Sequence, residues 1–205
     1  MPGQSWTVAR FKGVKIRLHL TLLLILPYLT YVTASRFGQL ASEAGLPVES
    51  LTLFEGRAGP LTWGALFALS LFGSVLLHEM AHVAVAVRQG SRVRSIMLMM
   101  LGGVSEVDPG DEGGAQSPRK EAVMALAGPA LSIGIALLGW LAWRRVPHAL
   151  SHPWISFYGH WIFKSNLVLA IFNLLPAFPL DGGRALRASL SARIGPVRAT
   201  RIAVR

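Results

Sequence analysis

The segment from His78 to His82 carries two histidines and a glutamate at a spacing that suits a metal ion. On an α-helix, residues i and i+4 lie on one face, one turn apart, so both imidazoles can reach the same ion. Glu79 projects about 100° away around the helix, beside the coordination position that the histidines leave open. A metal ion lowers the pKa of a bound water towards ~7, and a carboxylate there can take its proton. The segment is therefore a candidate metal site with Glu79 as general base.

The residues on either side of this motif are apolar, with SLFGSVLL before it and VAVAV after it. In a soluble helix the same pattern is often a solvated face without function. At membrane depth, however, a charged residue costs roughly 2.5–3.5 kcal/mol on insertion scales, and such residues are functional by default. Two imidazoles and a carboxylate favour zinc, although this ligand set also accepts other divalent metals.

A catalytic zinc site needs a third protein ligand, and Asp181 is the best candidate. It follows the uncharged run NLLPAFPL and precedes Gly182. The two prolines of that run force the backbone out of a helix, which is tolerated at membrane depth only inside protein or beside a water-filled cavity. A helix N-cap is the structural alternative for Asp181.

The other acidic and histidine side chains are weaker candidates for the third ligand. Four carboxylates lie in a glycine-rich segment and are expected to be solvated: Glu106, Asp108, Asp111 and Glu112. Three histidines fall near the opposite side of the membrane, where we expect surface or interfacial roles: His148, His152 and His160.

The composition is that of an integral, multi-pass membrane protein. The chain has 205 residues, of which 52% are hydrophobic and only 15% charged, and it has no cysteine. A soluble domain of this size cannot bury so much apolar surface, and the composition also excludes a disordered chain or a disulfide-stapled module. The net charge of +10 is more typical of loops that orient membrane spans than of nucleic-acid binding, which we do not expect.

Four predominantly apolar segments predict an all-α polytopic membrane protein with about four transmembrane helices in the lipid bilayer. The first span covers about 18–35, with a cleavable signal peptide as the alternative. The second covers about 61–87 and carries the histidine motif, the third covers about 122–143, and the fourth covers about 156–181. The stretch 36–60 is expected to be a loop.

Glycines and prolines predict further backbone features. The apolar patch from Ile96 to Val107 is too short to span, and Gly102-Gly103 in its middle predicts a membrane-associated β-hairpin at about 92–107, with a re-entrant segment as the alternative. Gly128-Pro129 should make the third helix start late or kink. Gly128 and Ser132 form a small-xxx-small pair that suits close contact between helices.

Lysine and arginine gather at alternate ends of the spans. The N-terminus, the 88–120 segment and the basic C-terminal segment 182–205 are rich in them, whereas 36–60 is poor. The positive-inside rule then places the N-terminus in the cytoplasm, with Arg144-Arg145 as one exception. The histidine motif and Asp181 both lie near span ends on this cytoplasmic side, at similar depth.

HEMAH on an apolar helix, AGPA at 127–130 and NLLPAFPLDGGR at 173–184 together resemble the site-2 protease family of intramembrane zinc metalloproteases, in its compact type without a PDZ insertion. The resemblance covers about residues 15–200. It implies Zn²⁺ bound by His78, His82 and Asp181, with Glu79 as the catalytic base. It also implies hydrolysis of peptide bonds in or near transmembrane segments of other proteins, commonly membrane-tethered transcription factors or anti-sigma factors, in a prokaryotic cell membrane.

The resemblance also suggests substrate-binding residues. Asn173 matches the asparagine of the family's second motif and by analogy binds the substrate or the oxyanion, with packing between spans as the alternative. Gly102 and Gly103 lie in a patch like the family's hairpin, which can pair with an extended substrate strand.

Other readings of the same residues stay open. A divalent-metal transporter can use the same ligands, and an inactive homologue can bind membrane clients without cleaving them. Because many compact members of the family carry further spans and a CBS-type regulatory pair, we expect the chain to be truncated at residue 205.

Overall fold

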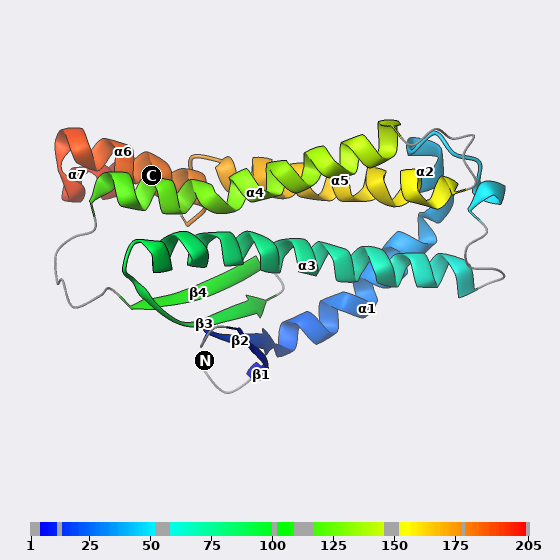
Figure 1. The fold of residues 1–205 in the computed structure, drawn as a ribbon, viewed down its shortest axis with the longest axis horizontal. Helices are drawn as coiled ribbons and strands as arrows, with labels where there is room; N and C mark the ends of the chain where they lie inside the picture. The colour runs from blue at the N-terminus through cyan, green and yellow to red at the C-terminus, as the bar shows by residue number, and fades with distance from the viewer. Residues whose placement is uncertain are drawn as a thin grey trace.

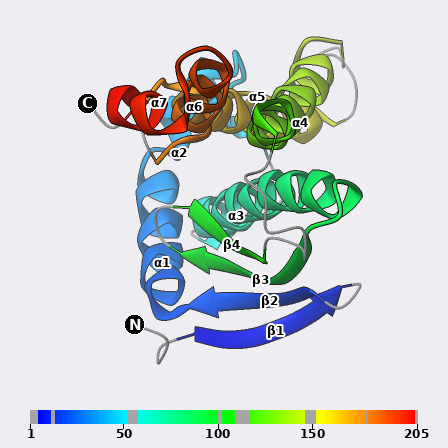
Figure 2. The ribbon, with the colours of Figure 1, turned by 90° about the vertical axis from the view of Figure 1, so that its left-hand side faces the viewer.

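The computed structural model describes residues 5–11, 14–51, 58–99, 102–108, 117–145, 152–177 and 179–203. Long helices lie side by side along its longest axis, with a small sheet beside one half of them (Figure 1). One layer consists of α4 (Pro118–Arg145), α5 (Pro153–Leu174), α6 (Asp181–Ile194) and α7 (Pro196–Ala203). The helix α3 (Ala58–Arg88) lies between this layer and the sheet, and α1 (Leu20–Ser35) flanks both (Figure 2).

Within the described residues, two helices are long and apolar enough to cross a membrane by themselves: Gly59–Arg88 within α3, and α4. The helices α1 and α2 (Phe37–Glu43) meet the same criterion as a pair, bent by 66°. The helix α5 does not meet it, because the polar side chains of His160, Lys164 and Asn166 interrupt its apolar residues. The chain is therefore a predominantly helical integral membrane protein, as its composition predicts.

The sheet is larger than the predicted hairpin. The strands β3 (Arg92–Met99) and β4 (Gly102–Asp108) pair antiparallel, which confirms the hairpin. The strands β1 (Ser5–Phe11) and β2 (Val14–His19) form a second antiparallel pair, and β2 joins β3 in parallel. The basic N-terminal segment, whose sequence predicts no strand, thus supplies two of the four strands of the sheet.

An apolar cluster packs the sheet against α1 and α3. Leu22 of α1, Phe72 and Val75 of α3, and Ile96 of β3 are buried together, and Leu18 of β2 packs against them. Apolar residues that alternate with Lys15 and Arg17 along β2 thus face the helices, while the charged residues face away.

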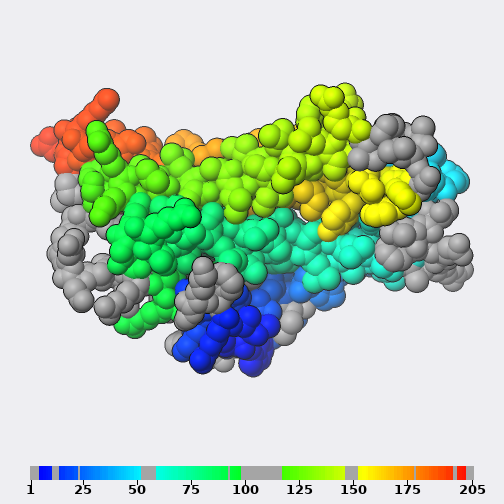
Figure 3. All heavy atoms as spheres, viewed as in Figure 1, coloured from blue at the N-terminus to red at the C-terminus, as the bar shows by residue number. Residues whose placement is uncertain are grey.

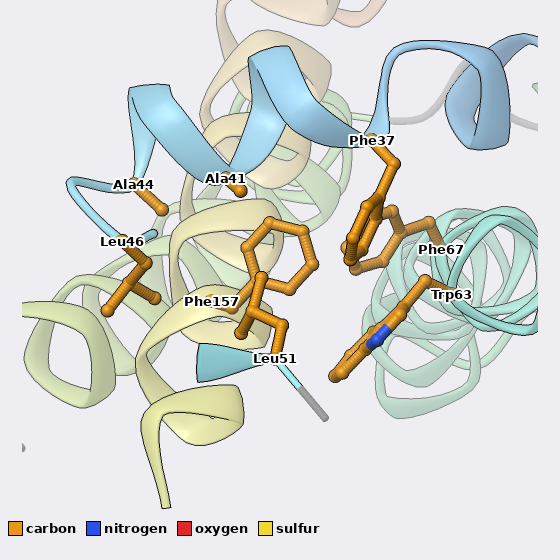
Figure 4. Packing of buried hydrophobic residues seen from close by; sticks show 8 residues of the cluster. All are labelled: Phe37, Ala41, Ala44, Leu46, Leu51, Trp63, Phe67 and Phe157. Atoms are coloured by element: carbon orange, nitrogen blue, oxygen red, sulfur yellow. The ribbon is translucent and has the colours of Figure 1, made fainter. Parts of the chain in front are cut away.

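A second, aromatic cluster (Figure 4) joins α2, α3 and α5 at the end of the molecule opposite α7 (Figure 1). Phe157 of α5 lies at its centre, with ring centroids 5.5 Å from Phe37, 5.1 Å from Trp63 and 5.3 Å from Phe67. Phe157 is only 1% exposed. This packing ties α2, α3 and α5 together far from the histidine motif.

The same cluster corrects the expectation that residues 36–60 form a loop. The described part of this stretch contains α2 and a short 3₁₀ turn, Val48–Ser50. Phe37, Ala41 and Ala44 recur at helical spacing and are buried in the aromatic cluster. Burial of this one face stabilises a helix that the surrounding charged residues conceal in the sequence.

The helix α4 runs without a break from Pro118 to Arg145, although Gly128-Pro129 predicted a late start or a kink. An interior proline removes one backbone hydrogen bond and crowds the preceding turn. Both Gly128 and Pro129 are buried, and α4 packs against α3, α5 and α6. Contacts along its length thus hold the helix together, and Figure 3 shows α4 extended over α3.

Candidate metal centre

One turn of α3 brings His78 and His82 together inside the bundle. Their ring centroids are 4.9 Å apart, and the two residues are 3% and 6% exposed. The surrounding helix is apolar, so packing of α3 against its neighbours buries the motif. Both imidazoles therefore face the same point, as the i, i+4 spacing on a helix predicts.

Asp181 is the residue that meets the imidazoles from another part of the chain. Its Oδ2 atom lies 3.1 Å from Nε2 of His78 and 3.1 Å from Nε2 of His82. Its Oδ1 atom lies 3.6 Å from Nη1 of Arg184, one turn further along α6. Asp181 is the first residue of α6, and Leu180 is the N-cap, so the side chain of Asp181 does not cap the helix.

The backbone around Asp181 explains how α6 can start at this place. The chain leaves α5 at Leu174 and begins α6 only seven residues later. A Cβ atom on Gly182 would lie 2.2 Å from the carbonyl oxygen of Leu174. Only glycine therefore lets the first turn of α6 approach the end of α5 closely enough to place Asp181 beside α3.

The helix α4 orients both imidazole rings. The carbonyl oxygen of Met124 accepts a hydrogen bond from Nδ1 of His82 at 2.7 Å. The hydroxyl group of Ser132 lies 3.0 Å from Nδ1 of His78, and Ser132 is completely buried. With each Nδ1 atom occupied, the Nε2 atoms are turned towards Asp181, which is the arrangement of metal-binding histidines.

This donor set fits a divalent cation. Because a carbonyl group only accepts hydrogen bonds, Nδ1 of His82 carries a proton, and Nε2 is the ring atom that a neutral imidazole offers to a metal ion. Oδ2 of Asp181 lies 3.1 Å from this atom. Zinc binds imidazole nitrogen and carboxylate oxygen at about 2.0–2.2 Å, so ligand atoms at this separation can share one ion.

Gly128 provides the space in which such an ion would lie. A Cβ atom at this position would be 2.3 Å from Nε2 of His82 and 2.5 Å from Nε2 of His78. Any side chain at this position would therefore clash with both imidazole rings. Gly128 thus lets the two rings take these positions, in addition to the close helix packing that the sequence suggests.

Glu79 lies beside the ligands on α3 and is half-buried. His78, Glu79 and His82 each offer one ligand atom, and these atoms all lie within 4.8 Å of one another. The Glu79 carboxylate is thus close enough to act on a water molecule at the same centre.

The remaining predicted site residues lie on α5 and β4. Asn173 is in the last turns of α5, where its Nδ2 donates a hydrogen bond to the carbonyl of Leu169 at 2.9 Å. Gly102 and Gly103 are the first residues of β4, opposite Met99 and Leu98 of β3.

Three of the weaker candidates for the third ligand lie outside the described residues: Asp111, Glu112 and His148. Glu106 and Asp108 belong to β4, and His152 is the N-cap of α5. The expectation of a surface role for His160 is wrong, because this residue is 6% exposed and its ring centroid lies 4.3 Å from that of Trp143. Close packing of α4 on α5 buries it.

A buried His-His-Asp site with an adjacent glutamate, whose histidines lie on a helix that can span a membrane, defines a membrane metalloprotein of the HExxH type. The chain belongs to peptidase family M50, whose model matches residues 66–148 and 145–205. The site-2 protease resemblance of the sequence motifs is thereby confirmed, and zinc is the metal that fits the site and the names of the relatives.

The fold is similar to that of the site-2 protease from Methanocaldococcus jannaschii, with a TM-score of 0.60 and 28% identity over 98% of this chain and 78% of that one. A zinc metalloprotease of the same organism is 34% identical over 97% of this chain. The stage IV sporulation protein FB of Bacillus subtilis is 35% identical over 62% of this chain and 41% of its own length. The chain spans about half the length of these curated relatives: 50% of the Methanocaldococcus jannaschii metalloprotease, and 48% of a putative zinc metalloprotease, Rip3, from Mycobacterium tuberculosis.

Proposed function

We propose that this chain is the core of an intramembrane zinc metalloprotease that hydrolyses peptide bonds in or near transmembrane segments of membrane-tethered regulatory proteins. The main support for the proposal is that Oδ2 of Asp181 lies 3.1 Å from Nε2 of His78 and 3.1 Å from Nε2 of His82. Glu79 beside this point supplies the base that hydrolysis requires and that a purely structural metal site does not.

The chain's own residues divide the reaction between them. His78, His82 and Asp181 would hold the zinc ion, which supplies a Lewis acid and lowers the pKa of a bound water. Glu79 takes a proton from the attacking water as the water oxygen bonds to the scissile carbonyl carbon. When the carbon–nitrogen bond breaks, Glu79 returns that proton to the leaving amine, so the products are a carboxylic acid and an amine.

The substrate must present an extended backbone, because a transmembrane helix hides its carbonyl groups in hydrogen bonds. The strand β4 is the last in the sheet order β1-β2-β3-β4, so one of its edges has no strand partner within the described residues. β4 also packs against α3 (Figure 2). We therefore propose that an unwound substrate segment pairs with β4, where Gly102 and Gly103 leave room for close approach.

Charge supports a position of the centre near the cytoplasmic face. The end of α3, the start of α4 and the start of α6 lie at the same end of the molecule (Figure 1). Basic residues are concentrated there: Arg88, Arg94, Arg119, Lys120, Arg184 and Arg187. The positive-inside rule places this end, and with it the N-terminus, on the cytoplasmic side of what we propose is a prokaryotic cell membrane.

The test is cleavage of tagged single-span substrates, among them anti-sigma factors and membrane-tethered transcription factors, by the zinc-loaded protein reconstituted in vesicles. The vesicles contain a zinc-sensitive dye and no free zinc, so zinc added outside measures metal transport in parallel. A chelator should stop the cleavage and added zinc should restore it, with product masses that map the cut to the substrate span. The His78→Ala variant is the control for a contaminating protease.

The outcomes separate protease from transporter. Cleavage without movement of zinc across the vesicle supports the proposal, and faster cleavage of substrates with glycine or proline in the span supports local unwinding. Zinc transport without cleavage of any substrate would reject the proposal in favour of a divalent-metal transporter with the same ligands.

A further inference from the structure

The third metal ligand is carried by a helix that does not itself pack closely on the histidine helix. Besides α7, the main packing partner of α6 is α4. The 3.1 Å contacts of Asp181 with the two imidazoles therefore depend on how α6 is held against α4. Whatever fixes this spacing also controls whether the third ligand reaches the ion.

One ion pair joins the two helices close to the centre. The guanidinium group of Arg187 in α6 contacts the carboxylate of Glu121 in α4. Arg187 lies six residues after Asp181, and Glu121 lies three residues before Met124. The side chains of Glu121 and Arg187 are only 14% and 33% exposed, so solvent screens their attraction less than that of a surface pair.

The ion pair of the neighbouring Arg184 does not link α6 to α4. It contacts Oδ1 of Asp181 at 3.6 Å, but both residues belong to α6. Arg184 thus orients the carboxylate within the helix, whereas Arg187 fixes the helix to α4. Glu121, in turn, lies one turn from the Met124 carbonyl that holds His82, so the same part of α4 sets the position of two ligands.

We propose that Arg187 and Glu121 are positioning residues for the metal centre. Their ion pair holds α6 at the distance from α4 at which Asp181 reaches both imidazoles, although neither residue contacts the ion. Loss of the pair lets the first turns of α6 move away, and the site then holds zinc with two imidazoles alone. This inference rests on the zinc site of the proposed function.

The test is the rate at which purified protein loses zinc to an excess of a coloured chelator. We would compare the parent, Glu121→Gln, Arg187→Gln and the exchanged pair Glu121→Arg with Arg187→Glu. Arg193→Gln is the matched control, because Arg193 is an exposed arginine in the last turn of the same helix. Thermal unfolding of the zinc-free proteins is recorded alongside, since general damage to the fold would change it.

Groups that hydrogen-bond directly to metal ligands contribute about 10–100-fold in metal affinity. Because Glu121 and Arg187 act only through the position of α6, each single substitution should speed zinc loss by about 10-fold, the lower end of this range, while the exchanged pair returns to within about 3-fold of the parent. Arg193→Gln should match the parent, and the zinc-free melting temperatures should agree.

Two results would overturn the inference. One is parental zinc retention in both single variants. The other is faster loss that the exchanged pair does not reverse. Failure of the parent itself to bind zinc would be a different result, since it rejects the zinc site and the proposed function along with this inference.

Discussion

The carbonyl oxygen of Met124 accepts a hydrogen bond from Nδ1 of His82 at 2.7 Å. A main-chain atom of one helix thereby fixes the orientation of a metal-facing side chain on another. Ser132 contacts Nδ1 of His78, and Gly128 between them leaves the space that the two Nε2 atoms face. A single stripe of α4 thus builds the surroundings of a centre to which it contributes no ligand.

Replacement of Ser132 by alanine should weaken zinc binding without unfolding the protein. The hydroxyl group is the 3.0 Å partner of Nδ1 of His78, and removal of such a partner typically lowers metal affinity by about 10–100-fold. Competition against a fluorescent zinc chelator measures this affinity.

Ser156→Ala is the matched control for this substitution. Ser156 is also completely buried, but its hydroxyl group donates to the carbonyl of Trp143 at 3.0 Å, away from the centre. It should leave the zinc affinity unchanged. Equal zinc affinities for Ser132→Ala and the parent would show that Ser132 does not orient the ring.

Alanine at position 128 should abolish zinc binding. Its Cβ atom would lie 2.3 Å from Nε2 of His82, in the space where the ion must lie. The zinc content of the purified variant, measured by mass spectrometry, should fall close to zero. Gly134→Ala tests the same change on the same helix, where a Cβ atom meets nothing within 4 Å, and it should keep the full zinc content. A fully loaded Gly128→Ala protein would contradict the position of the ion.

The sequence predicts the ligand set but not the parts that orient it. His78 and His82 stand out because ionisable residues are rare in an apolar helix, and Asp181 because two prolines and two glycines surround it. Ser132 and Gly128 are visible only as a small-residue pair, which serves equally for helix packing. The Met124 carbonyl has no signature at all, because every residue carries such a group.

The elements of the fold that depend on local sequence are likewise predictable, whereas those that depend on contacts between distant segments are not. Long apolar runs predict α3 and α4, and the paired glycines predict the hairpin of β3 and β4. The strand β2 alternates Val14, Ile16 and Leu18 with basic residues, but its pairing with β3 joins segments about 80 residues apart. Pairing between such distant segments depends on tertiary packing, which the local sequence pattern does not reveal. From the sequence alone, the basic residues of this strand indicate only that the N-terminus lies on the cytoplasmic side.

Asn173→Ala should separate binding of the metal from catalysis. The residue is half-buried in the last turns of α5, and its Nδ2 donates to the carbonyl of Leu169. If the side chain turns to the oxyanion during the reaction, its loss lowers kcat by about 10²–10³-fold while the zinc content stays full. Cleavage rates at saturating substrate measure this effect. An unchanged kcat would leave Asn173 with packing and its helix hydrogen bond as its roles.

The most direct test of the account is the comparison of the parent with Glu79→Gln at matched zinc content. The substitution keeps the size of the side chain and removes its capacity to take a proton, and it leaves His78, His82 and Asp181 in place. We expect the parent to cleave a single-span substrate and Glu79→Gln to do so at least about 100-fold more slowly. Equal cleavage rates for the two zinc-loaded proteins would contradict the assignment of Glu79 as the base and, with it, the proposed mechanism.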